Sequence, residues 1–223
     1  MRFLKLFIII ILLLSTLLVI AQEKTLRQIF DYIILTTEPI ASSELKEKGM
    51  PKDFYSAKKA FDDKIETAWV EGVEGDGINE YIIFYLFFGG PYPIYKDYIN
   101  KDIKVEITII NGVAKNKRIW EMNNRIKKAE LEIYEAVVDI RQIDPWIVCA
   151  QEPILNTTFI LNLKDDMKPQ KFLLKFKPKQ LGIAKDIESF LCIGKLIIKE
   201  VYPGTKYKDT GISEINARRI DED

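Results

Sequence analysis

The sequence predicts an all-β fold built from antiparallel strands, a β-sandwich or barrel, behind an N-terminal signal helix. Apolar and charged residues alternate along residues 103–109, 128–133 and 171–177. Period-two alternation turns one face of a strand inward and the other to water, as in antiparallel sheets with one solvated side. Turn signals separate the strands, at Gly89-Gly90-Pro91, Asn111-Gly112, Asp165-Asp166 and Pro203-Gly204. Many short strands with such punctuation are typical of sandwiches and barrels.

Residues 1–21 have the three-part pattern of a secretory signal peptide. Arg2 and Lys5 form a basic start, an apolar segment follows, and Ala21 is a small residue at the expected cleavage site. We therefore expect cleavage after Ala21 and a secreted or periplasmic protein. The apolar segment is shorter than the roughly 20 residues that span a bilayer. An uncleaved N-terminal anchor is the alternative.

The rest of the chain divides into three parts. Residues 22–38 form a lead-in, a short helix or an irregular segment, because apolar residues recur at helical spacing from Leu26 onward. Residues 39–217 hold the β pattern and form one domain. Residues 218–223 are a charged tail, which we expect to be frayed.

Composition excludes several classes of function. The 33 Lys and Arg residues balance 33 Asp and Glu residues, whereas nucleic-acid binding rests on clustered basic residues. The chain has no histidine, which excludes a His-based catalytic triad and leaves a zinc site poorly supplied with ligands. Cys149 and Cys192 form either one disulfide or two separate buried thiols, because sequence alone does not show whether their Cβ atoms meet.

Residues 60–80 are rich in carboxylates and punctuated by glycine. Gly72, Gly75 and Gly77 weaken any regular strand and predict a shaped surface loop. The acidic residues of this stretch are Asp62, Asp63, Glu66, Glu71, Glu74, Asp76 and Glu80. Closely spaced carboxylate and carbonyl oxygens suit a hard cation such as Ca²⁺.

Aromatic rings with polar side chains beside them are what a sugar ligand needs. Trp69 and Trp120 are candidates for stacking, although large aromatic residues are mostly buried and either ring has a structural alternative. The candidates for contacts with sugar hydroxyls are Glu71, Asn79, Asn123, Asn124 and Arg125. The run Asn123-Asn124-Arg125 beside a tryptophan has no evident folding role, and arginine suits planar polar recognition.

Several sequence blocks together resemble a known family. They are AFDDKIETAWVEGVEGDGINE at residues 60–80, Ile110-Asn111-Gly112, Trp120, NNRIK at 123–127 and VYPGTKYKDTGISEI at 201–215. In this order they resemble the NADase-type glycan-binding, or translocation, domain, a discoidin-like (F5/8 type C-like) domain among the galactose-binding-like jelly rolls. The resemblance spans about residues 39–217 and implies a jelly-roll β-sandwich that binds a glycan or glycoconjugate. It does not carry over NADase activity, because we expect no enzyme segment beside the jelly roll.

The resemblance also implies a structural Ca²⁺. In such jelly rolls a cation ties an early loop to the last strand, and the matching residues here are Asp62, Thr67 and Glu214, with backbone carbonyls of Ala60 and Ser213. The chain departs from the family in having Asp63 where glycine is usual and Lys64 at the next polar position. The alternative is a metal-free turn in which Asp62 hydrogen-bonds its own loop.

We therefore expect a secreted or periplasmic module that binds carbohydrate and is not an enzyme. The alternative is a protein-interaction module of the cell envelope that uses the same loop face; a carboxylate-dependent hydrolase is a weaker third option. A glycan site is expected to show an exposed aromatic residue lining a polar depression, whereas a protein-binding face is expected to show a larger apolar patch.

Overall fold

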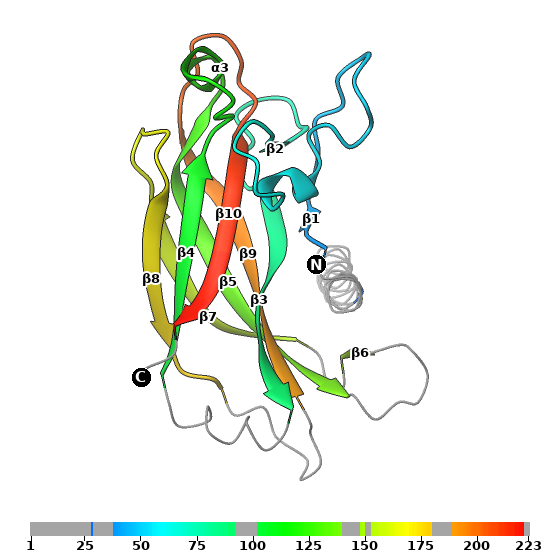
Figure 1. The fold of residues 1–223 in the computed structure, drawn as a ribbon, viewed down its shortest axis with the longest axis vertical. Coiled ribbons are helices and arrows are strands. Elements are labelled where there is room, and N and C mark those ends of the chain that lie inside the picture. Colours follow the sequence, from blue (N-terminus) through cyan, green and yellow to red (C-terminus); the bar gives the residue numbers. More distant parts are fainter. Residues whose placement is uncertain are drawn as a thin grey trace, which may run out of the picture.

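The computed structural model describes residues 38–91, 102–139, 148–149, 153–179 and 189–220, together with residue 28. Its strands form two antiparallel sheets that pack face to face as a sandwich (Figure 1). The larger sheet has the order β1 (Ile40–Ala41), β3 (Tyr81–Pro91), β9 (Ser189–Tyr202), β5 (Arg125–Asp139) and β6 (Val148–Cys149), and β7 (Ile154–Asn162) also pairs with β5. The smaller sheet has the order β2 (Trp69–Val70), β10 (Gly211–Ile220), β4 (Ile103–Asn111) and β8 (Gln170–Phe176). The predicted all-β antiparallel sandwich is confirmed.

The alternation read from the sequence forms the core between the sheets. Along β4, every second residue from Ile103 to Ile109 is buried, and the residues between them are partly exposed. From the facing sheet, Ala129, Leu131 and Ile133 of β5 have no exposed surface. These side chains belong to one continuous hydrophobic cluster.

Strands β3 and β9 are buried on both faces, which explains their nearly continuous apolar sequence. Ile82 and Phe84 of β3 face the main core, while Ile83 joins a second apolar cluster with Ile193 of β9. Strand β9 lies between β3 and β5 in the larger sheet.

Strand β10 lies inside the smaller sheet, between β2 and β4. It continues through Arg218 to Ile220, so these three residues are strand and not the frayed tail that we expected. Arg218 Nε donates to Glu106 Oε1 of β4 at 2.9 Å, an ion pair on the outer face of the sheet. Residues 221–223 lie outside the described residues.

Two local expectations need correction. The turn expected at Gly89-Gly90-Pro91 is absent, because β3 runs on to Pro91, opposite Ser189, with register shifts that absorb the irregular residues. A six-residue helix, α3 (Lys117–Met122), was not anticipated. Its N-cap is Asn116, whose side chain accepts from the backbone N–H of Ile119 at 3.0 Å. A short 3₁₀ helix, η1 (Ala57–Ala60), precedes β2.

Cys192 is a free, fully buried thiol, so the structure has no disulfide at this residue. The strand register explains why. Cys192 pairs with Glu135 on one side of β5, whereas Cys149 pairs with Val138 on the other side. Their backbones are separated by two strand spacings of about 4.8 Å each. Together these exceed the roughly 7 Å between Cα atoms that a disulfide can span. The expected signal peptide and nearly all of the lead-in lie outside the described residues. No helix among the described residues is long and apolar enough to cross a membrane.

Candidate functional site

Helix α3, strand β2 and several connections gather at one end of the sandwich, at the top of Figure 1. The connections are residues 42–56, 71–80, 163–169 and 203–210. We call this region the loop end. It contains all the residues that the sequence proposed as ligand contacts.

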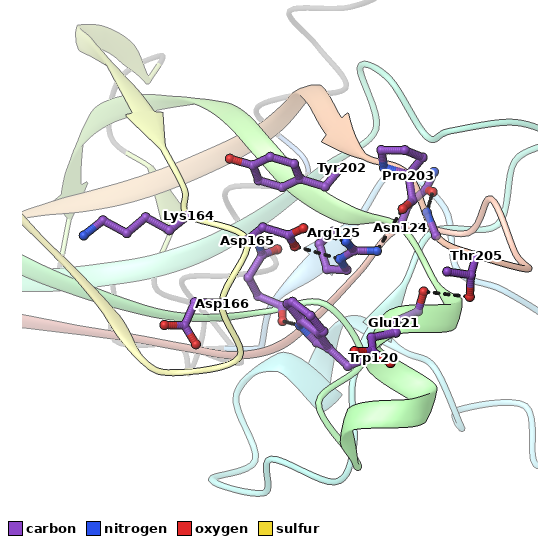
Figure 2. Close-up of polar contacts among 12 residues, drawn as sticks. Trp120, Glu121, Asn124, Arg125, Lys164, Asp165, Asp166, Tyr202, Pro203 and Thr205 are labelled. Carbon is purple, nitrogen blue, oxygen red and sulfur yellow. Dashed lines mark hydrogen bonds and ion pairs between the residues drawn. The ribbon is translucent and has the colours of Figure 1, made fainter.

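Arg125, the first residue of β5, holds four segments together (Figure 2). Its Nε and one terminal nitrogen donate to the two carboxylate oxygens of Asp165 at 2.9 and 2.8 Å. Its other terminal nitrogen donates to the backbone oxygens of Asn123 and Pro203, each at 3.0 Å. The guanidinium also lies 4.7 Å from the ring centroid of Trp120. Trp120, Asn124, Arg125 and Asp165 form what we call the Arg125 cluster.

Trp120 and Asn124 are as fully engaged as Arg125. Trp120 is 7% exposed and its Nε1 donates to the backbone oxygen of Asn111 at 2.8 Å. Asn124 is 1% exposed; its Nδ2 donates to the Lys208 backbone oxygen at 2.7 Å and to Asp76 Oδ1 at 3.1 Å. Its Oδ1 accepts from the backbone N–H of Gly204 at 2.7 Å. The Asn-Asn-Arg run therefore has a folding role that sequence reasoning missed.

Gly112 shows how tightly the cluster is packed. A Cβ atom there would lie 2.7 Å from Arg125 Cγ and 2.8 Å from Trp120 Cδ1, and the residue has a φ of +76°. Both facts require glycine at the end of β4, because an L side chain is strained in this region and would collide with the cluster.

Trp69 and Glu71 also lie inside the molecule. Trp69 has no exposed surface and its Nε1 donates to the backbone oxygen of Ser43 at 3.0 Å, so its ring presents no face to a ligand. Glu71 is equally buried and accepts from the backbone N–H groups of Thr210 at 3.1 Å and Val73 at 2.9 Å. Burial raises the pKa of Glu71, and these two hydrogen bonds counteract the rise.

Only two of the proposed ligand residues keep substantial exposure. Asn79 is exposed, has a left-handed φ of 72°, and its Oδ1 accepts from Lys199 Nζ at 3.4 Å. Asn123 is half-buried at the C-cap of α3, where its Nδ2 donates to the backbone oxygen of Ile119 at 2.9 Å.

The structure brings Asp62, Thr67 and Glu214 together. Thr67 Oγ1 donates to Asp62 Oδ1 at 2.7 Å, and the backbone N–H of Lys64 donates to the same oxygen at 3.2 Å. The Glu214 carboxylate lies near the Asp62 and Asp63 carboxylates. Burial, together with the charges of Asp63 and Asp62, raises the pKa of Glu214 to about 7. The two departures from the family pattern are accommodated. Asp63 takes the left-handed φ of 57°, which Asp tolerates better than most residues, and Lys64 is exposed.

Two oxygens of this turn fit a hard cation. Asp62 Oδ2 and Glu214 Oε2 are buried and lack a hydrogen-bond partner, and such groups are costly unless something else satisfies them. Lys59 Nζ lies 3.7 Å from Asp62 Oδ2 and compensates part of the charge. Within the described ranges, no three Asp, Glu, Cys or His side chains form a metal-binding group, so a cation here would also need backbone carbonyls as ligands.

Two adjacent cavities at the loop end were not anticipated. The first has a volume of about 370 Å³ and we call it the lysine cavity; its charged lining residues are Lys59, Glu66 and Lys115. The second has a volume of about 300 Å³ and we call it the acidic cavity; its polar lining residues are Glu47, Tyr55, Asn123, Tyr207 and Asp209. Both cavities are lined by Met50, Tyr55, Val113 and Ile119, and together they form the loop-end groove. The lining residues come from separate segments and share no sequence spacing, so only the folded structure reveals the groove.

Comparison with protein families gives a match that covers most of the chain. Residues 32–218 match the NAD glycohydrolase translocation F5/8 type C domain, a non-catalytic domain family, and this confirms the resemblance read from the sequence. None of the curated proteins matches the chain.

Several solved structures are similar. One is an F5/8 type C domain from Bacteroides fragilis, with a TM-score of 0.41 and 14% identity over 81% of this chain and 89% of that one. Another is a putative chitobiase fragment from Bacteroides thetaiotaomicron, with a TM-score of 0.40 and 13% identity over 77% of this chain and 80% of that one. The arabinofuranosyltransferase AftD from mycobacteria has a TM-score of 0.44 and 13% identity over 82% of this chain. The chain spans only 10% of AftD.

Proposed function

Because the chain belongs to the NAD glycohydrolase translocation F5/8 type C domain family, we propose that it is a non-catalytic carbohydrate-binding module whose ligand contacts the loop-end groove. F5/8 type C domains often bind glycans. The chain's signal-like N-terminus supports a secreted or periplasmic location, where glycans of cell surfaces are accessible.

The observation that carries this proposal is the lining of the groove. Phe54 and Tyr207 are 38% and 40% exposed and present aromatic surface, while Asn123 and the carboxylates of Glu47 and Asp209 supply planar polar groups nearby. Small-ligand pockets combine apolar walls with a few placed polar groups, in volumes of roughly 300–1,000 Å³. Among the predicted ligand residues, Asn123 is the one that lines the groove.

A Ca²⁺ at Asp62, Thr67 and Glu214 is the second part of the proposal. The ion would neutralise the two unpartnered carboxylate oxygens and join the turn after η1 to β10. Thr67 also lines the lysine cavity, so the ion would stabilise one wall of the groove without contacting the sugar.

A protein partner in the cell envelope is the alternative use of this end. Five large apolar side chains outside the core are exposed on residues 50–78, namely Met50, Phe54, Ile65, Val73 and Ile78. Exposed apolar residues gathered on one part of a surface mark protein–protein contacts as well as ligand grooves.

The test is a glycan-array screen of the purified protein, with and without a calcium chelator. Phe54→Ala and Tyr207→Ala remove groove aromatics, and Leu173→Ala is the matched control, since Leu173 is 66% exposed on β8 away from the groove. We expect specific glycan binding that both groove variants lose and the control keeps. Binding that disappears only with chelator would support the cation.

A folded protein that binds no glycan would contradict the proposal. A pull-down from envelope extract with the same three variants would then test the alternative, which requires that the groove variants lose a partner and Leu173→Ala keeps it.

A further inference from the structure

The two cavities of the groove share a wall and differ in charge. The lysine cavity is lined by two basic residues and one acidic residue. The acidic cavity is lined by Glu47 and Asp209 and by no lysine or arginine. Among the lining residues of the groove, acidic side chains therefore outnumber basic ones in the acidic cavity only.

Both carboxylates of the acidic cavity are available to a ligand. Neither forms an ion pair with any residue in the described part of the chain. Glu47 Oε2 accepts one hydrogen bond, from the Tyr55 hydroxyl at 3.1 Å, and keeps further acceptor capacity. The backbone oxygen of Asp209 accepts from the backbone N–H of Asn124 at 3.0 Å. The Asp209 side chain has no hydrogen-bond partner among the described residues.

The two carboxylates lie around a common aromatic residue. Burial, the hydrogen bond to Glu47 and the charges of Glu47 and Asp209 raise the pKa of Tyr55 to about 12. The phenol therefore stays protonated at neutral pH, and Tyr55 lines the same cavity as both acidic groups.

The second aromatic residue already holds an ammonium group. Lys206 Nζ lies 4.7 Å from the ring centroid of Tyr207, although Lys206 does not line the cavity. An ammonium over an aromatic face is attracted by the ring, and the attraction increases where water is excluded. Lys206 already occupies one face of Tyr207, so the Glu47 and Asp209 carboxylates are the groups of this cavity that are complementary to a further cation.

We propose that the acidic cavity recognises a sugar that carries a free amine, a 2-amino-2-deoxyhexose unit in its ammonium form. The ammonium would lie between Glu47 and Asp209, and the C–H face of the sugar ring would lie against Tyr207 and the apolar wall of Ile119 and Met122. This inference rests on the proposed function and specifies its ligand.

The test compares a glucosamine tetramer with an N-acetylglucosamine tetramer by titration calorimetry on the full chain. Acetylation removes the charge and leaves the sugar rings unchanged. A hydrogen bond to a charged group typically changes affinity by a factor of ten or more, so we expect at least about tenfold tighter binding of the free amine. Asp209→Asn and Glu47→Gln should each weaken that binding by about tenfold and leave the acetylated sugar little affected.

Glu74→Gln is the matched control, because Glu74 is an exposed carboxylate of the loop end that lines neither cavity. If this variant weakens binding as much as the cavity variants, the preference is general attraction to acidic surface and the inference is wrong. If both tetramers bind equally, the inference is overturned while glycan binding stands. If a folded protein binds neither these sugars nor any arrayed glycan, both fail. A lysine-rich peptide that binds where the amino sugar does not would also overturn it, in favour of a protein partner.

Discussion

The Arg125 cluster and the acidic cavity lie at the same end of the sandwich, and both combine aromatic rings with charged side chains. In the cluster, Arg125 and Asn124 direct every polar contact at partners within the protein. In the acidic cavity, Glu47 and Asp209 keep side-chain oxygens that have no partner among the described residues. Aromatic and charged side chains therefore stabilise the fold in the cluster, whereas in the acidic cavity we propose that they contact a ligand.

The difference lies in where the hydrogen bonds end. Arg125 donates to backbone oxygens of loops that flank three different strands. Its side chain therefore satisfies backbone groups that have no strand partner at the loop end. A buried polar group that is fully paired strengthens a fold, whereas an exposed one with spare capacity costs little and stays available. Four predictions test this contrast.

Arg125→Ala should have the largest effect. The variant leaves the backbone oxygens of Asn123 and Pro203 and the carboxylate of Asp165 without their donor. Asp165 is partly exposed and is hydrated in the variant. We therefore expect the free energy of unfolding to fall by about 3 kcal/mol, the low end of the range for breaking a buried ion pair. Urea denaturation measures it. A loss below about 1 kcal/mol would mean that the cluster is not structural.

Asn124→Ala should lower the free energy of unfolding by about 2 kcal/mol, because it removes the side-chain partner of the Gly204 N–H and of the Lys208 backbone oxygen. The same denaturation experiment measures it. Asn123→Ala is the matched control, since Asn123 is half-buried and makes one side-chain hydrogen bond. Equal losses in the two variants would show that the position inside the cluster is unimportant.

Glu214 tests a carboxylate that is buried and only partly satisfied. Its pKa in the folded protein is about 7, above the ordinary value of 4.5, so folding favours the protonated form. Stability should therefore fall as the pH rises from 4.5 to 7. Burial also raises the pKa of Glu135 to about 7, so this residue changes stability with pH in the same direction.

Thermal melts between pH 4 and pH 8 should thus show a declining melting temperature that Glu214→Gln makes less steep. If Ca²⁺ binds at Glu214, it should raise the melting temperature of the parent protein at pH 8 and raise that of Glu214→Gln much less. A rise of equal size in both proteins would argue that the ion binds elsewhere.

Tyr207→Ala should have the smallest effect on stability. Tyr207 is 40% exposed and its side chain makes no hydrogen bond among the described residues, so we expect a change within about 0.5 kcal/mol. Glycan binding should nevertheless be lost. A stability loss as large as that of Asn124→Ala would place Tyr207 with the structural residues and remove the contrast.

The strands were predictable because alternation depends on neighbours two residues apart. The inward residues of β4 and β5 were read correctly in this way. The roles of Trp69 and Arg125 were not, because their partners are backbone oxygens at Ser43 and Pro203, which only the folded chain brings near. Pro91 was misread as a turn because a bulge tolerates residues that interrupt a regular strand.

The groove escaped sequence reasoning for a different reason. It is formed by single residues of separate loops, such as Tyr55 and Tyr207, which share no spacing or motif. The grouping of Asp62, Thr67 and Glu214 was foreseen only through the family resemblance, because a turn and a strand more than 140 residues apart give no periodic signal.

The position of β10 has a consequence for how the protein is made. This strand is the last of those described along the chain, yet it lies in the middle of the smaller sheet. Its partners are much earlier in the sequence: β4 ends about 100 residues before β10 begins, and β2 about 140 residues before. The loop end also closes on it, through Glu71 N to Thr210 O and Gly112 N to Gly211 O. Such long-range pairing makes folding slow. The chain therefore cannot complete the smaller sheet or close the loop end before β10 has been made.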